Sequence, residues 1–144
     1  YVKSSEEYVT LGRKMVGNDN ILKAQVDVSL KTSYSEINEM LLKLYSLDSK
    51  QGYIVAKYFN DMEKIIEKMY KMLKYDGKVV VKISNSKVKK IDVETGKFLT
   101  IIAISKGFKL KEMFLDKIEN RTLTTARNTY SDIILKDNII IWEK

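Results

Sequence analysis

The residues best suited to chemistry in this 144-residue chain are cationic and amide side chains gathered in two segments, 84–97 and 119–131. Lysine and arginine hold phosphates, and asparagine can hydrogen-bond a base edge, so these residue types together indicate contact with a nucleic acid. The candidate nucleic-acid-binding residues are Asn85, Lys87, Lys89, Lys90, Arg121, Arg127, Asn128 and Tyr130. Each also has a structural interpretation: a solvated lysine surface, an arginine paired with Glu119 or Asp132, asparagines that form turns, and a tyrosine that anchors a hairpin.

Arginine usage supports the nucleic-acid interpretation. The chain has 23 lysines but only three arginines, Arg13, Arg121 and Arg127. Where lysine is the default cation, an arginine is expected where its planar, bidentate fork is needed. Two of the three fall within seven residues of each other, beside Tyr130, which could stack on a base that has left the duplex.

The positive charge is localised. The chain carries a formal charge of +7, and residues 77–111 hold nine lysines against Asp92 and Glu94, which is also a net of +7. A basic patch of this kind favours a polyanionic partner, and a nucleic acid before a membrane.

Composition excludes several classes of enzyme. The chain has no cysteine, so disulfides, zinc–thiolate sites and cysteine nucleophiles are excluded. It has no histidine, which removes the Ser-His-Asp triad and the usual general base at neutral pH. The acidic residues show no metal-ligand spacing, so we predict neither a catalytic residue nor a metal site.

Two regions must position the candidate residues. Residues 1–53 are expected to form a mainly helical or irregular segment, and residues 54–144 an α/β unit. In the first region, Ser33 and Glu36 read as a capping box, followed by a helical apolar face at Ile37, Met40, Leu41 and Leu44, and then a polar break over 46–52.

In the second region the patterns predict helix 54–74, strand 79–83, loop 84–97, helix 98–105, strand 108–118 and strand 138–143. The β-branched run at 79–83 is typical of a strand buried on both faces, and Gly77 is expected to end the preceding helix in a left-handed conformation. The alternation of 108–118 slips near Glu112, which suggests a bulge.

The helix between strands 79–83 and 108–118 predicts a parallel crossover, and the last two strands should be antiparallel. The carboxyl ends of parallel strands are where ligands meet such sheets, so loops 84–97 and 119–131 should share one edge. Strand 79–83 should be an unpaired edge, which could associate with another polypeptide.

Several stretches resemble one family in this order: Tyr58–Met62, the segment Met72–Val81 with its Leu-Lys-x-x-Gly turn, Lys82–Val88, Asn120–Asn128 and Asp137–Lys144. Together they resemble bacterial and archaeal site-specific DNA methyltransferases that modify an exocyclic amino group, giving N4-methylcytosine or N6-methyladenine. The stretch Leu11–Gly17 is similar to the segment that follows the catalytic motif in that group.

The resemblance implies the second half of a Rossmann-like methyltransferase sheet, mostly parallel, with a C-terminal antiparallel strand pair and an N-terminal helical segment. It implies DNA as substrate and S-adenosylmethionine as cofactor of the complete enzyme. The chain departs from the family in two motifs. Its six glycines are scattered and make no cofactor-binding turn, and without proline it cannot contain the Pro-Pro catalytic motif. We therefore expect no cofactor on this chain alone and no activity of its own.

The expected partners are DNA and the missing N-terminal methyltransferase half, in the same chain or in a separate subunit, or a second copy in a homodimer. A stand-alone nucleic-acid-binding module, an inactive partner subunit of a split methyltransferase and a purely structural interaction domain are the alternatives. The lack of a membrane span or a signal-peptide core predicts a cytoplasmic protein with no membrane partner.

Overall fold

The computed structural model describes residues 4–117 and 136–144. The chain divides into two compact units, Tyr1–Met62 and Glu63–Lys144, and helix α3 (Ser49–Met72) runs through the division. The boundary expected after residue 53 remains a prediction. No helix in the described ranges is both long enough and apolar enough to cross a membrane.

The first unit is helical. Helix α1 (Ser5–Lys14) begins after Ser4, whose Oγ accepts a hydrogen bond from the Glu7 amide at 3.1 Å. A short 3₁₀ helix, η1 (Lys23–Gln25), precedes helix α2 (Ser35–Leu47). The predicted apolar face of α2 is confirmed, because Ile37, Met40, Leu41 and Leu44 are all buried.

The predicted capping box at the start of α2 is wrong. The helix begins at Ser35, and its N-cap, Tyr34, makes no side-chain capping bond. Asn38 instead holds the incoming chain, since its Oδ1 accepts from the Thr32 amide and its Nδ2 donates to the Thr32 carbonyl, both at 2.9 Å. A side chain inside the helix therefore anchors the chain that enters it.

The polar break expected over 46–52 is also wrong, because α2 ends at Leu47 and α3 starts at Ser49. Gly52 lies within α3, where an added Cβ would sit 2.6 Å from Cδ1 of Tyr45. The glycine therefore marks a close approach of α3 to a side chain of α2, and not a turn.

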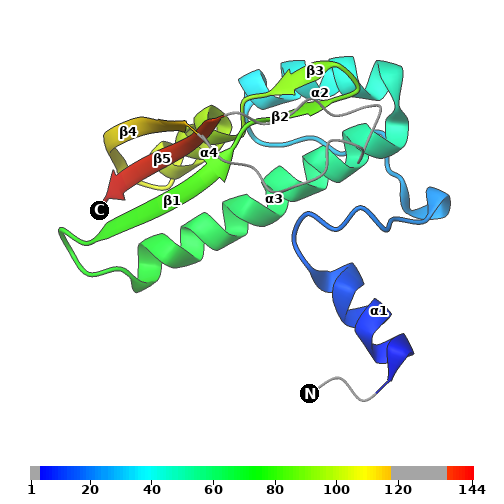
Figure 1. The fold of residues 1–144 in the computed structure, drawn as a ribbon, viewed down its shortest axis with the longest axis horizontal. Helices are drawn as coiled ribbons and strands as arrows, with labels where there is room; N and C mark the ends of the chain where they lie inside the picture. Colours follow the sequence, from blue (N-terminus) through cyan, green and yellow to red (C-terminus); the bar gives the residue numbers. More distant parts are fainter. Residues whose placement is uncertain (1–3, 118–135) are drawn as a thin grey trace. The chain divides into compact units, whose positions relative to one another are not determined.

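The second unit is built on a three-stranded sheet of order β1-β5-β4, in which β5 (Lys136–Glu143) lies between β1 (Lys78–Ser84) and β4 (Lys109–Lys117), as Figure 1 shows. Both pairings are antiparallel. The expected mostly parallel, Rossmann-like sheet is therefore wrong, because the last strand enters between the two earlier strands and separates them. The antiparallel pairing of the last two strands and the irregularity between Leu110 and Glu112 are confirmed.

One face of this sheet is buried. Asn138, Ile140 and Trp142 of β5 point to it, and helix α4 (Thr95–Ser105) contacts all three strands. The indole Nε1 of Trp142 donates to Thr100 Oγ1 at 3.4 Å, which satisfies the one polar atom of a side chain that is 1% exposed. The ring of Phe108 packs between those of Trp142 and Tyr70, at centroid distances of 6.0 and 5.0 Å.

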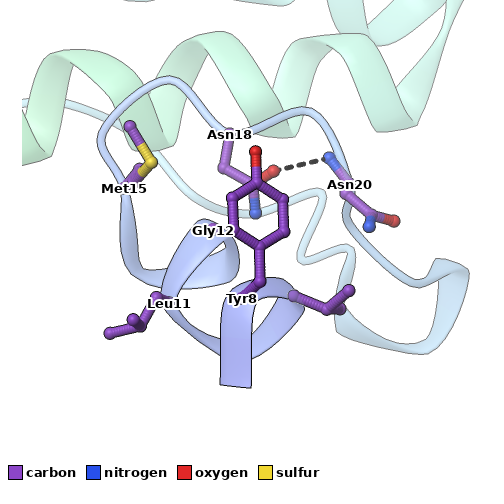
Figure 2. A pocket seen from close by; sticks show the side chains of 7 residues that line it. Tyr8, Leu11, Gly12, Met15, Asn18 and Asn20 are labelled. Atoms are coloured by element: carbon purple, nitrogen blue, oxygen red, sulfur yellow. Dashed lines mark hydrogen bonds between the residues drawn. The ribbon is translucent and has the colours of Figure 1, made fainter. Parts of the chain in front are cut away.

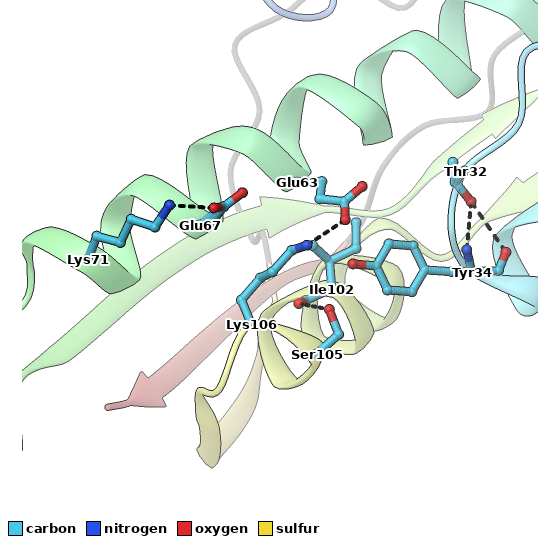
Figure 3. Close-up of polar contacts among 8 residues, drawn as sticks. All are labelled: Thr32, Tyr34, Glu63, Glu67, Lys71, Ile102, Ser105 and Lys106. Carbon is cyan, nitrogen blue, oxygen red and sulfur yellow. Dashed lines mark hydrogen bonds and ion pairs between the residues drawn. The ribbon is translucent and has the colours of Figure 1, made fainter.

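Within the same unit, an ion pair joins α3 to the residue that follows α4. Lys106 Nζ lies 2.6 Å from Glu63 Oε1, and both side chains are largely shielded (Figure 3). The next residue, Gly107, adopts a φ of +105°, and an added Cβ would lie 2.8 Å from the ring of Tyr70. Only glycine fits this tight exit from α4 without strain.

Among the described residues, the opposite face of the sheet, which we call the open face, has an exposed apolar centre between charged side chains. Val80 is 65% and Phe114 49% exposed, and they flank Ile139 and Ile141 of β5. Strand β1 is thus not buried on both faces, as its sequence suggested, but it does lie at an edge of the sheet as expected. The left-handed residue after α3 is Asp76, with a φ of 58°, and not Gly77.

Lys144 secures the end of α3 to the end of the sheet. Its Nζ donates to the carbonyls of Tyr70 and Leu73 at 2.7 and 2.8 Å and lies 4.7 Å from the centroid of the Tyr70 ring. A cation at the C-terminus of a helix satisfies carbonyls that have no partner within the helix and complements the helix dipole.

We expect Lys144→Met to lower the free energy of unfolding by about 1–2 kcal/mol, because it removes charge-assisted hydrogen bonds to two carbonyls. Lys71→Met is the matched control, since it breaks only the exposed i,i+4 pair with Glu67 and should cost about 0.5 kcal/mol or less. Urea unfolding of both variants measures the difference, and equal losses would contradict the capping role.

Candidate nucleic-acid interface

Strands β1 and β4 end on the same side of the sheet. We call this side, at the C-terminal ends of both strands, the basic edge. Because both strands are antiparallel to β5, they run in the same direction. Ser84 of β1 and Asp116 of β4 are both opposite Asp137 in the strand register. Strands β1 and β4 therefore end at the same edge although they are not neighbours, whereas the position expected for loop 119–131 lies outside the described residues.

A lysine-tipped hairpin follows β1 at this edge. The segment expected to be a loop over 84–97 contains strands β2 (Ser86–Val88) and β3 (Ile91–Val93), which pair antiparallel as a separate two-stranded sheet. Val88 is opposite Ile91, so the connection between the strands is only Lys89 and Lys90.

The tip of the hairpin has a strained backbone. Lys89 and Lys90 have φ values of 50° and 67°. Two consecutive left-handed residues in a two-residue connection are the pattern of a type I′ turn, which favours Asn-Gly. Left-handed geometry costs a residue with a Cβ about 1–2 kcal/mol relative to the right-handed form. Lysine is therefore unfavourable at both positions of the turn, which indicates that the positive charge of the two side chains has a function.

Lys87 lies in β2, opposite Asp92 of β3, and its Nζ is 3.5 Å from the Asp92 carboxylate. Lys90 is exposed, whereas the side chains of Lys87 and Lys89 are half-buried. The structure thus brings three of the predicted phosphate-binding lysines onto one hairpin of eight residues, Ser86–Val93.

Asn85 has a structural role. Its Oδ1 accepts hydrogen bonds from the Gly96 amide near the start of α4 and from Nδ2 of Asn138, both at 3.2 Å. Asn138 also donates to the Ile83 carbonyl at 3.3 Å and is 7% exposed. The pair of asparagines therefore ties β1, β5 and α4 together beneath the hairpin, and the sequence reasoning missed Asn138.

A cluster of charges on the open face was also missed. Lys82 Nζ lies 2.8 Å from Asp116 and 3.4 Å from Asp137, and Asp137 accepts a hydrogen bond from Ser84 Oγ. The hydrogen bond to Asp116, followed by that to Asp137, raises the pKa of the Lys82 ammonium above its ordinary value. These acids come from strands distant in sequence, so only the register could have predicted that they neutralise Lys82.

Arg121, Arg127, Asn128 and Tyr130 lie outside the described residues, and their roles remain predictions. Strand β4 is described as far as Lys117 and β5 from Lys136, and these two residues are opposite each other in the register at the basic edge.

A separate small hollow lies in the first unit. Tyr8, Leu11, Gly12 and Met15 line it together with Asn18, and its volume is about 280 Å³ (Figure 2). Asn18 Oδ1 accepts from the Asn20 amide at 2.9 Å, while Asn18 Nδ2 is buried without a hydrogen-bond partner. Across residues 4–117 and 136–144, no group of three or more acidic side chains is arranged to hold a metal ion.

Compared with models of protein families, with curated proteins and with solved structures, the chain shows no significant similarity to any of them. A function can therefore be inferred from the residues at the basic edge and from the sequence stretches that resemble DNA methyltransferases.

We expect Asn85→Ala to lower the free energy of unfolding by about 1–2 kcal/mol, because it leaves the Gly96 N–H without its acceptor and removes one of the two acceptors of the Asn138 amide. Asn85→Asp should stay within about 0.5 kcal/mol of the wild type, since a carboxylate keeps both acceptors and is favoured near a helix N-terminus. Urea unfolding of the two variants tests this role, and an alanine variant as stable as the wild type would refute it.

Proposed function

We propose that this chain is the DNA-contacting portion of an amino-methylating DNA methyltransferase, and that it contacts DNA at the basic edge. The observation that carries the proposal is the hairpin tip, where two lysines occupy left-handed positions at the edge where β4 ends and β5 begins. Cations fixed on a projecting hairpin are suited to phosphates, which are the sequence-independent part of a DNA contact.

The distribution of charge supports this edge over the sheet itself. On the open face, Lys82 is paired with Asp116 and Asp137, and Lys78 and Lys111 lie 3.9 and 3.5 Å from Glu143. Three lysines of the sheet are thus paired with its acids. The eight residues of the hairpin, Ser86–Val93, hold three lysines and one acid, Asp92, a net charge of +2 that favours a polyanion.

In this proposal, methyl transfer requires residues that the chain lacks. S-adenosylmethionine would donate the methyl group in the complete enzyme, but the residues of this chain do not fit that cofactor, because no glycine-rich turn follows a strand. The catalytic Pro-Pro motif is likewise absent. We therefore assign DNA contact to this chain and the chemistry to a complementary methyltransferase half.

The open face and the free edge of β1 support a complementary half. The Lys144 amide donates to the Gly77 carbonyl at 3.1 Å, so in the antiparallel alternation the backbone groups of Val80 and Lys82 point away from β5. Val80 thus belongs both to the open face and to the edge of β1 that no other described strand pairs, which is the exposure expected of a surface for another polypeptide.

A stand-alone nucleic-acid-binding module is the second candidate, because the basic edge does not itself require a methyltransferase partner. The stand-alone module and the split methyltransferase differ in one measurable property. In the module, the 144-residue chain alone should reach full DNA affinity, whereas in the split enzyme DNA binding should strengthen when the complementary half is present.

We expect the double substitution Lys89→Asn/Lys90→Gly to have opposite effects on stability and DNA affinity. Asn-Gly suits a type I′ turn, so the free energy of unfolding should rise by about 1 kcal/mol. The affinity for a labelled duplex oligonucleotide should fall at least severalfold, and the slope of log affinity against log salt should become shallower by up to about 1.8, at about 0.9 per lost phosphate contact.

Lys68→Gln/Lys74→Gln is the control, because it removes the same charge from another part of the chain. Fluorescence anisotropy at several salt concentrations and urea unfolding give both quantities. If the two double variants weaken DNA binding equally, net charge alone explains the binding and the hairpin has no special role.

A further inference from the structure

Asp92 is an exposed acid in the middle of the basic hairpin. Its side chain is 77% exposed, whereas the side chain of Lys87, the cation opposite it, is 35% exposed. The inward face of the hairpin contains Val88, Ile91 and Val93, and Val93 is 3% exposed. Because side chains alternate along a strand, Lys87 and Asp92 occupy the outward face, where DNA would lie under the proposed function.

An acid in this position opposes DNA binding in two ways. It repels phosphates that approach the hairpin, and its carboxylate occupies a position 3.5 Å from Lys87 Nζ that a phosphate oxygen would otherwise take. An exposed pair of this kind adds little to stability, so exchanging the carboxylate for a phosphate is not costly.

We propose that Asp92 competes with DNA phosphates for Lys87 and thereby limits the affinity of the hairpin for DNA. This inference rests on the proposed function. It adds one residue that weakens DNA binding to the set of residues that bind DNA. Limiting the sequence-independent phosphate contact is useful to a site-specific enzyme, because that contact holds the protein equally at every site.

A purely structural role for the pair makes a different prediction. Oppositely charged residues directly across a strand pair stabilise the pairing and help fix its register. If this were the only role of Asp92, replacing it would loosen the hairpin and weaken DNA binding, or leave binding changed only by the altered net charge.

The test compares Asp92→Asn with Glu67→Gln in the full 144-residue chain. Both substitutions remove one negative charge from an exposed pair with a lysine, and Glu67 lies on α3, away from the hairpin in the fold. Binding of a labelled duplex oligonucleotide is measured by fluorescence anisotropy across a salt series. We expect Asp92→Asn to bind severalfold more tightly than Glu67→Gln, with a slope steeper by about 0.9, as for one added phosphate contact.

A double-mutant cycle shows whether Lys87 carries the effect. In the Lys87→Gln background, Asp92→Asn should lose most of its gain, because the cation for which Asp92 competes is absent and only the smaller relief of phosphate repulsion remains. Equal affinities of Asp92→Asn and Glu67→Gln, or a gain that persists without Lys87, would overturn the inference while leaving the proposed function intact. If the wild-type chain and every variant fail to bind the duplex, the proposed function falls and the inference falls with it.

Discussion

Strand β5 forms every inter-strand hydrogen bond of the three-stranded sheet, because β1 and β4 each pair with β5 and not with each other. Its buried side chains, Asn138, Ile140 and Trp142, face helix α4 and supply the central part of the core of the second unit. The same strand brings Asp137 to Lys82 and Asn138 to Asn85. The direction of β1 and β4, the burial of α4 and the position of the basic edge therefore all depend on one strand entering between two others.

That arrangement separates the charges of the chain. Acids from β4 and β5 lie against three lysines of the sheet, Lys78, Lys82 and Lys111. Part of the net charge of residues 77–111 is thus offset by acids outside that range, whereas the hairpin Ser86–Val93 has a net charge of +2 in its own sequence. Electrostatic attraction of DNA depends on such local potential more than on total charge, which is why the tip and its one acid, Asp92, are the informative positions.

The backbone of the tip and the open face of the sheet are both unfavourable for an isolated protein. Left-handed lysines and an exposed Val80 cost stability or solubility without benefit to this fold. Both features are explained if a polyanion binds the hairpin tip and another polypeptide covers the open face. Local conflicts between sequence preference and structure are expected at functional positions.

The sequence alone determined the features that depend on local pattern. The periodic apolar face of α2, the existence of β1, β4 and β5, the irregularity before Glu112 and the antiparallel last pair all follow from the spacing of side chains along the chain. The start of α2 was misjudged, because Asn38 holds Thr32 and the predicted capping box does not form. The tertiary structure alone decided strand order, since the hydrophobic pattern of a strand does not specify its neighbour. It also decided which lysines are neutralised and that Asn85 supports α4. Asp116 lies 34 residues from Lys82, and Gly96 lies on the far side of the hairpin from Asn85, so no local pattern could indicate either contact.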